Sequence, residues 1–203
     1  RAKLRLFSEI LVPEGTAILH CGLEKYDLVK KVCQQRGHKV VSYGRKGADL
    51  AIIGQHPIEQ GQRLEIDVKG KRYTVNLPLV GFYQAENVMC ALAIALETEV
   101  ELAVSLGALE MFSCVSGRLQ RVARHPCGAD IYVDYAHTPD ALESTLKTLR
   151  PYAPKQLVLV FGCGGDRDRG KRSVMGGVAC KHADKVIITD DNPRNEDPGF
   201  IRK

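Results

Sequence analysis

The chain has 203 residues, enough for one large domain or two small ones, and its 44% hydrophobic content is sufficient for a real core. The net charge of +5 comes from scattered basic residues with few aromatic residues among them, which argues against a nucleic-acid-binding stripe. The 7 cysteines include no CxxC pair, so the sequence predicts reduced thiols in a cytoplasmic protein rather than a disulfide framework or a zinc site.

No apolar run is long enough to cross a membrane, and no signal peptide is recognisable. We therefore expect neither a membrane nor a nucleic acid among the partners of this protein. The chain lacks an initiator methionine and ends at Lys203, just after a turn-rich segment, which predicts an internal fragment of a longer protein.

Helical and extended patterns alternate along the first part of the chain. In chain order the expected elements are a helix over 1–11, a strand over 16–21, a helix over 24–36, strands over 39–43 and 49–55, a hairpin with arms 64–68 and 72–77 around a turn at 69–71, and helices over 86–96 and 100–111. Small residues over 113–117 break this pattern. We therefore expect two domains, over 1–115 and 116–203.

The second part is predicted to contain a strand–helix–strand unit. Residues 157–161 and 185–189 are short apolar runs typical of parallel strands that are buried on both faces, and 170–182 has a helical pattern. The elements expected before this unit are strands over 118–124 and 130–134 and a helix over 141–149, with Thr138 as its cap and Pro139 at its first position.

The loop after the first of these strands is rich in glycine, with Gly162, Gly164 and Gly165. We expect it to turn tightly and to leave its backbone open to a ligand at the carboxyl end of the strand. A P-loop pattern fails because Arg172 lacks the hydroxyl that binds magnesium, and a dinucleotide fingerprint fails because Arg167 replaces its third glycine. A loop with both Asp and Arg suits a zwitterion such as an amino acid; the alternative is a solvated loop whose charges serve solubility.

Four motifs of the second part occur in a fixed order. They are Asp134-Tyr-Ala-His137-Thr-Pro139-Asp140, Phe161-Gly-Cys-Gly-Gly-Asp-Arg-Asp168, Gly170-Lys171-Arg172 and Asp190-Asp-Asn-Pro-Arg194. Together they resemble the Mur ligases of peptidoglycan synthesis, and within that family the branch that adds the third residue of the stem peptide.

The resemblance implies an α/β protein of three domains: one for a UDP-sugar, a central ATPase, and a Rossmann-like C-terminal domain for the incoming amino acid. Residues 1–115 would then be the latter portion of the central Mur ligase ATPase domain, and 116–203 the first half of the Rossmann-like domain. The glycine-rich ATP loop and the closing strands and helices would lie outside the chain, so we expect the fragment alone to be inactive.

The reaction that the resemblance implies is the ATP-dependent formation of an amide bond. A carboxylate of UDP-N-acetylmuramoyl-L-alanyl-D-glutamate attacks the γ-phosphate of ATP, and an amine of meso-diaminopimelate then attacks the acyl phosphate. Positioning and charge neutralisation supply most of the rate of such a reaction. We expect Mg²⁺ as the cofactor, ATP as a co-substrate, a cytoplasmic location and a monomer.

The resemblance also assigns roles to individual residues. Lys3 stands where the family has a carbamylated lysine, an oxygen ligand suited to Mg²⁺, and is expected to be catalytic together with His137. The expected nucleotide-binding residues are Gln84, Asn87, Arg118, Asp134 and His137. The expected amino-acid-binding residues are Arg167, Asp191, Asn192, Pro193 and Arg194.

Each assignment has a plainer alternative. Turn chemistry explains Asn192-Pro193 well but does not explain Arg194, and Gln84 stands where the family more often has Asn.

Two other functions stay open: a folylpolyglutamate synthetase, which shares the Asp-x-Ala-His element, and a nucleotide-binding module without catalysis. Tyr135 and Thr138-Pro139 fit the Mur branch better than the folate branch.

Overall fold

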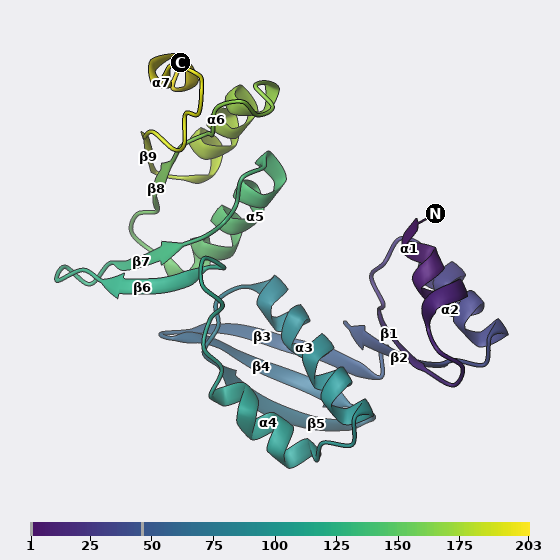
Figure 1. Cartoon of the computed structure of the whole chain (residues 1–203). Coiled ribbons are helices and arrows are strands. Elements are labelled where there is room, and N and C mark those ends of the chain that lie inside the picture. The colour runs from purple at the N-terminus through teal and green to yellow at the C-terminus, as the bar shows by residue number, and fades with distance from the viewer. Residues whose placement is uncertain (1, 46) are drawn as a thin grey trace. The chain divides into compact units, whose positions relative to one another are not determined.

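The fold is taken from a computed structural model that describes residues 2–45 and 47–203, with side chains from residue 4 onward. The chain divides into two compact units, Arg1–Ser113 and Cys114–Lys203 (Figure 1). We describe each unit by itself. No helix in the described part of the chain is both long enough and apolar enough to span a membrane.

The first unit is built on a sheet of five strands in the order β1-β2-β3-β4-β5. Strands β1, β2 and β3 run parallel, whereas β3, β4 and β5 form an antiparallel meander. The strands are β1 (Thr16–His20), β2 (Lys39–Gly44), β3 (Leu50–Ile58), β4 (Gly61–Val68) and β5 (Lys71–Leu77). The helices are α1 (Ala2–Arg5), which continues into a wider π-helical turn over Leu6–Ile10, α2 (Tyr26–Gln35), α3 (Phe82–Glu97) and α4 (Leu102–Glu110).

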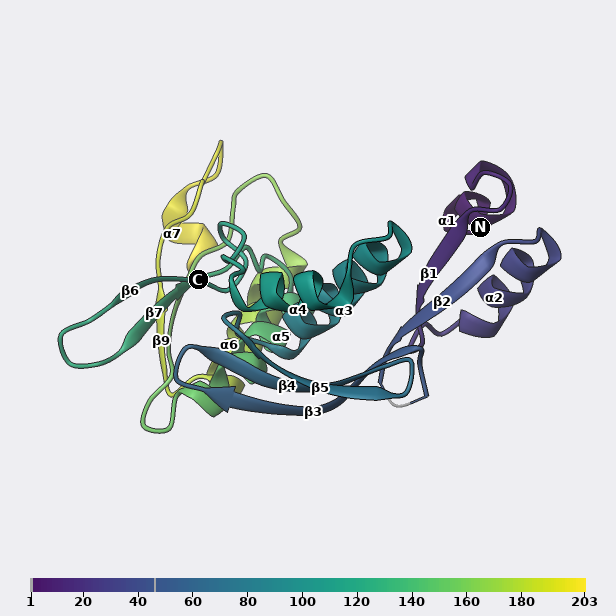
Figure 2. The same ribbon diagram turned by 90° about the horizontal axis from the view of Figure 1, so that it is seen from below.

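The core of this unit lies between the sheet and two helices. Helix α3 packs on β1, β2 and β3, and α4 packs on β5, so that both helices lie on the same side of the meander (Figure 2). The alternation of apolar and charged side chains along β4 explains this arrangement. Leu64 and Ile66 point inward and are fully buried, while Arg63 and Glu65 point outward. Met89 and Leu92 of α3 complete this core.

The expected elements of the first part are all present, with differences at their ends. Helix α3 begins at Phe82, four residues before the expected start at Glu86. The hairpin turn is shorter than expected, because Lys71 already pairs with Val68 in the ladder. Lys69 and Gly70 both have positive φ angles, of 51° and 87°, as a two-residue hairpin turn requires.

The second unit contains two small sheets. Strands β6 (Gln120–Arg124) and β7 (Asp130–Val133) form an antiparallel ribbon, and β8 (Val158–Phe161) and β9 (Lys185–Ile188) are parallel. The helices are α5 (Pro139–Leu149), a 3-10 turn over Arg150–Tyr152, α6 (Gly170–His182) and a short α7 (Pro198–Ile201). Thr138 caps α5 as expected, because its hydroxyl oxygen accepts a hydrogen bond from the Ala141 N–H at 3.3 Å.

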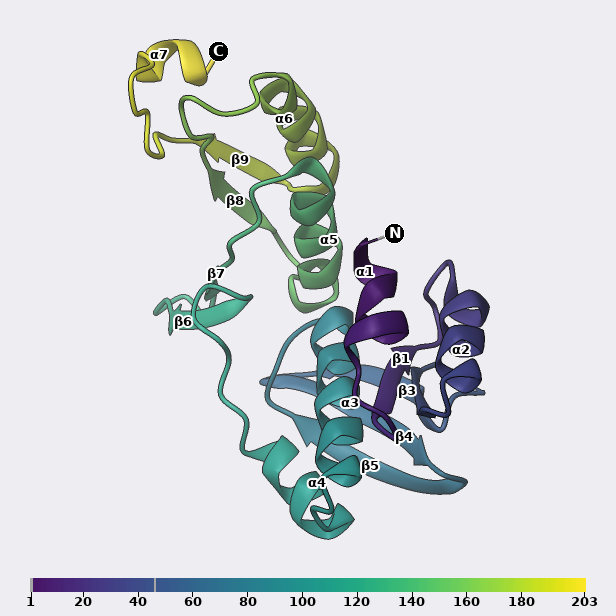
Figure 3. The ribbon, with the colours of Figure 1, turned by 45° about the vertical axis from the view of Figure 1, so that its right-hand side comes forward.

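The expectation that β8 and β9 are buried on both faces is wrong for the described residues. Helices α5 and α6 pack side by side (Figure 3), and Leu146 and Met175 bring their buried side chains into this layer. Val158 and Val160 remain 47% and 58% exposed. A continuous apolar run indicates that both faces of a strand can be buried, but it does not indicate which part of the protein buries the second face.

Candidate functional site

Two loops meet where β8 and β9 end. Because β8 and β9 are parallel neighbours, the loop over 162–169 and the loop over 189–197 leave the same edge of the sheet. A Cβ atom on Gly165 would lie 1.8 Å from the Pro193 carbonyl oxygen, and one on Gly162 would lie 2.5 Å from the Thr189 oxygen. The expectation that these glycines open the backbone to a ligand is therefore corrected: Gly162 and Gly165 make room for the second loop.

The close approach brings the Asp-Asn-Pro-Arg segment onto the glycine loop. The Gly165 N–H donates to the Asn192 carbonyl oxygen at 2.9 Å, and the Arg194 Nη1 donates to the Gly165 carbonyl oxygen at 2.7 Å. The Asn192 side-chain oxygen accepts from the Arg194 N–H at 3.1 Å. Arg194 also has a φ of 49°, which a residue with a Cβ atom seldom adopts. Its guanidinium is thus tied to the loop by one nitrogen, in a backbone conformation that the surroundings must enforce.

Two charged side chains of the predicted set remain unengaged. Arg167 lies on the first loop and Asp191 on the second, and both are exposed. Within residues 2–45 and 47–203, neither side chain takes part in a hydrogen bond or ion pair. The paired loops therefore present Arg167 and Asp191 to solvent and hold Arg194 through a single nitrogen.

Glu196 is a further element of this site that the sequence analysis missed. Its carboxylate accepts from Arg172 Nη2 at 2.8 Å and from the Asp166 N–H at 2.7 Å, and it lies 3.1 Å from Arg169 Nη2. The carboxylate of Asp166 accepts a further hydrogen bond, from the side-chain nitrogen of Asn195 at 2.8 Å. The Arg172 guanidinium, with smaller contributions from the Asp166 N–H and Arg169, lowers the pKa of Glu196 to about 2.

This carboxylate makes the stability of the second unit dependent on pH in a defined window. Because its pKa is lowered from 4.5 to about 2, its contribution is fully present above pH 4.5 and is lost as the pH falls toward 2. We expect Glu196→Gln to lower the free energy of unfolding at pH 7 and to approach the wild type near pH 2. Unfolding in urea between pH 7 and pH 2 measures the difference; a gap that already closes above pH 5 would contradict the assignment.

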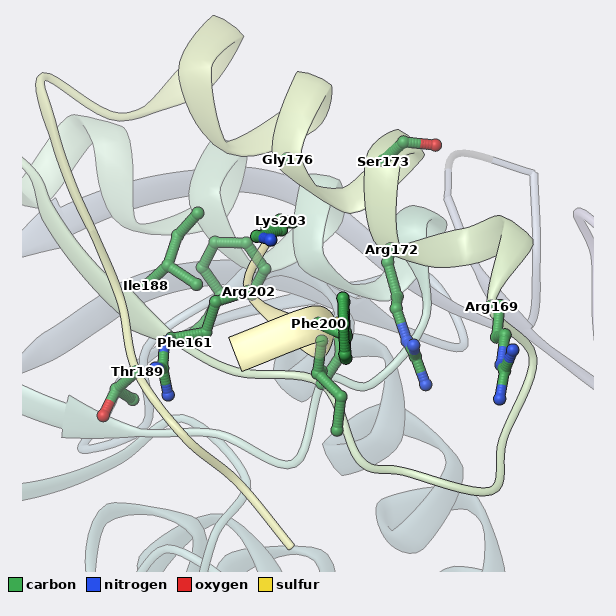
Figure 4. Close-up of a pocket in the computed structure, with 12 residues that line it drawn as sticks. Phe161, Arg169, Arg172, Ser173, Gly176, Ile188, Thr189, Phe200, Arg202 and Lys203 are labelled. Atoms are coloured by element: carbon green, nitrogen blue, oxygen red, sulfur yellow. The ribbon is translucent and has the colours of Figure 1, made fainter. Parts of the chain in front are cut away.

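A cavity of about 440 Å³ lies at the same edge of the sheet (Figure 4). Its apolar wall includes Phe161, Ile188 and Phe200, and its basic lining residues are Arg169, Arg172, Arg202 and Lys203. The predicted amino-acid-binding residues do not line it. Cys163 does line it, and burial raises the pKa of its thiol, which agrees with a space-filling role.

A second group of predicted residues gathers at the end of β7. The Asp134 carboxylate accepts from the Leu119 N–H at 2.8 Å, from the Ala136 N–H at 3.0 Å and from the Thr145 hydroxyl at 3.0 Å. The Arg118 guanidinium lies 5.0 Å from the centre of the Tyr135 ring. Arg118 and Asp134 are thus brought to one place, where the Asp134 carboxylate connects the segment before β6, the segment after β7 and helix α5.

His137 follows on the same segment, and the hydrogen-bond partner of its Nδ1 determines which ring nitrogen carries the proton. Its Nδ1 lies 3.0 Å from the Tyr135 carbonyl oxygen, and because a carbonyl only accepts, Nδ1 carries the proton. Its Nε2 is left for another partner. Lys171 of α6 donates to the His137 carbonyl oxygen at 2.7 Å. Lys171 therefore connects the helix that follows the glycine loop to the His137 segment, a link that the sequence motifs did not indicate.

The remaining predicted residues belong to the first unit. Gln84 is 8% exposed in the first turn of α3, whereas Asn87 is exposed one turn later. Phe82, at the start of the same helix, lies beneath the Arg45 guanidinium at 4.2 Å. Lys3 belongs to α1, but its side chain lies outside the described residues. The part of the chain with described side chains holds no group of three His, Cys, Asp or Glu residues able to bind a metal.

Comparison with known proteins gives matches along almost the whole chain. Residues 1–95 match the family model described as the Mur ligase middle domain, and residues 117–203 match the model described as the Mur ligase, glutamate ligase domain. UDP-N-acetylmuramoyl-L-alanyl-D-glutamate–2,6-diaminopimelate ligases are similar: that of Bradyrhizobium diazoefficiens is 47% identical over 99% of the chain, and that of Zymomonas mobilis is 43% identical over 100%. A solved structure of a ligase with this name is 35% identical, with a TM-score of 0.70, over 98% of this chain and 41% of its own. The chain spans 42% of the length of each of the two relatives.

Proposed function

The chain belongs to the Mur ligase family, and we propose that it forms part of an ATP-dependent ligase that adds meso-diaminopimelate to UDP-N-acetylmuramoyl-L-alanyl-D-glutamate. Similarity to diaminopimelate ligases along the whole chain supports this activity over that of a folylpolyglutamate synthetase or a non-catalytic module. The local sequence around Tyr135 and Thr138-Pro139 favours the same choice.

Within this ligase, residues 1–115 are proposed to be the latter portion of the central ATPase domain and 116–203 the first half of the amino-acid-binding domain. The division of the fold near Ser113 and the two family matches support this assignment. The ATP loop and the UDP-sugar-binding domain would be supplied by other segments of the full-length protein. A cytoplasmic location is proposed, because ATP and a UDP-linked substrate are both cytoplasmic molecules. A monomer is proposed from the family resemblance alone.

The observation that carries the proposal is the charge pattern on the paired loops. Arg194 is anchored to the Gly165 carbonyl at 2.7 Å, and Asp191 and Arg167, which lie on the same two loops, take part in no hydrogen bond or ion pair within the described residues. Diaminopimelate carries a carboxylate and an amine at each end. A guanidinium complements a carboxylate in a two-pronged manner, and an aspartate complements an amine. Asn192 and Pro193 are proposed to shape the turn that presents these groups.

We propose nucleotide-binding roles for residues of each unit, considered separately. Asn87 offers a donor and an acceptor to the adenine edge, Arg118 suits a phosphate, and Nε2 of His137 is available because Nδ1 is held by Tyr135. Gln84 and Asp134 are proposed to support the nucleotide site, since the first is buried and the second is hydrogen-bonded to Leu119 and Thr145. A carbamate on Lys3 would hold Mg²⁺, which neutralises phosphate charge when bound.

The test is the complete reaction of the full-length protein. We expect ADP, phosphate and a UDP-linked tripeptide to form only when ATP, the UDP-linked dipeptide and meso-diaminopimelate are all present. Mass spectrometry of the product identifies the added residue. Glutamate addition to a folate would favour the folate ligase, and ATP binding without turnover would favour the non-catalytic module.

A further inference from the structure

A fully buried amide lies beneath the start of α3. Gln62, the second residue of β4, is 0% exposed. Its Nε2 donates to the Leu79 carbonyl oxygen at 2.7 Å and to the Gly81 carbonyl oxygen at 2.9 Å, and its Oε1 accepts from Gln55 of β3. Both donors and the acceptor are therefore engaged, and two of these three bonds go to the backbone that leads into α3.

The chain before α3 depends on these bonds. Leu79 and Val80 are buried, and Pro78 has no N–H. Gly61 lets β4 begin close to this segment, because a Cβ atom there would lie 2.1 Å from the Leu77 carbonyl oxygen. A buried carbonyl that loses its donor costs free energy, so the two N–H groups of Gln62 stabilise this path of the backbone.

The same bonds determine where α3 begins. Gly81 has φ 106° and ψ 146°, a conformation open essentially to glycine alone, and its carbonyl oxygen accepts from the Gln84 N–H at 3.1 Å as well as from Gln62. The first turn of α3 and the Gln62 amide thus converge on one oxygen atom. A shift of Gly81 would move Phe82 and, one turn further on, Asn87.

We propose that Gln62 is a positioning residue for the nucleotide: it fixes the Leu79–Gly81 backbone and thereby the direction in which Asn87 faces the adenine. The inference rests on the proposed function, in which Asn87 contacts ATP. Recognition of a base edge by an amide depends on placement within about 0.5 Å, and such placement requires a supporting residue that is itself locked. Gln62 is locked by three bonds and by complete burial.

The decisive variant is Gln62→Glu in the full-length ligase. Glutamate keeps the length and the acceptor but has no N–H, so the Leu79 carbonyl loses its bond from Gln62, and the Gly81 carbonyl keeps only its bonds from the N–H groups of α3. We expect the KM for ATP to rise by roughly tenfold or more, with kcat at saturating ATP within about threefold of the wild type and the KM for meso-diaminopimelate unchanged. We also expect the preference for ATP over GTP to fall, which a loss of folded protein alone would not cause.

The matched control is Gln55→Met, which removes only the bond to the Gln62 oxygen and is expected to raise the KM for ATP much less than Gln62→Glu does, because both bonds from Gln62 to the Leu79 and Gly81 carbonyls remain. If Gln62→Glu does not fold, Gln62→Met carries the test, because it keeps the length of the side chain without a charge. An unchanged KM for ATP and an unchanged ATP-to-GTP preference in the folded Gln62 variant overturn the positioning role. A wild type that forms no UDP-linked tripeptide instead overturns the proposed function.

Discussion

In the full-length ligase, the Lys3→Arg variant is expected to turn over about a thousandfold more slowly than the wild type. Lys3 is proposed, from the resemblance to the Mur ligases, to carry a carbamate, an anion whose oxygen atoms suit Mg²⁺. Arginine keeps the positive charge of lysine but forms no stable carbamate, so a cation would replace the anion. Loss of the charge stabilisation that a bound metal provides, roughly 4 kcal/mol, corresponds to this factor.

Two measurements separate this role from a general loss of structure. Removal of dissolved carbon dioxide should lower the kcat of the wild type, and bicarbonate should restore it, whereas Lys3→Arg should respond to neither. Lys31→Arg makes the same substitution on the exposed surface of α2 and is expected to match the wild type. Near-normal turnover by Lys3→Arg would refute the carbamate.

The elements that the sequence predicted best are those whose signals are local. Helix α6 has the predicted bounds, and Thr138 caps α5 as expected, because capping and helical periodicity depend on neighbours a few residues apart. The role of Gly165 was predicted wrongly. A missing Cβ atom shows that something approaches closely, but only the fold shows that it is the Pro193 carbonyl rather than a ligand.

The contacts that complete the candidate site could not be read from the sequence. Arg172 and Glu196 are 24 residues apart, and Lys171 and His137 are 34 apart, so neither pair leaves a pattern in one sequence. Gln62 likewise lies outside the expected elements, two residues before the predicted arm over 64–68. Its burial becomes evident only when β4 is paired with β5 and the chain after Leu77 folds over it. Long-range polar contacts of this kind are determined by topology rather than by local propensity.

Arg194→Ala is expected to abolish most of the preference for meso-diaminopimelate over lysine. The two amino acids differ by the carboxylate at the far end of the side chain, which lysine lacks. Arg194 is proposed to bind that carboxylate, and a two-pronged, charge-assisted pair of hydrogen bonds contributes a few kcal/mol that lysine cannot recover. We therefore expect the wild type to prefer meso-diaminopimelate by roughly a hundredfold or more in kcat/KM, and the variant to discriminate by less than about tenfold.

The contacts of Arg194 determine how this experiment must be controlled. Its Nη1 also donates to the Gly165 carbonyl, so alanine removes a bond between the two loops as well as a ligand for the substrate. Arg194→Lys keeps a cation but not the two-pronged geometry, and it should retain an intermediate preference. Asn195→Ala removes another bond between the loops, that of its side-chain nitrogen to Asp166 at 2.8 Å, and leaves the guanidinium in place. If the loss of loop contacts were the cause, Asn195→Ala would reduce the preference as Arg194→Ala does. If Arg194 binds the distal carboxylate, Asn195→Ala lowers kcat/KM for both amino acids to a similar extent and leaves their ratio near that of the wild type.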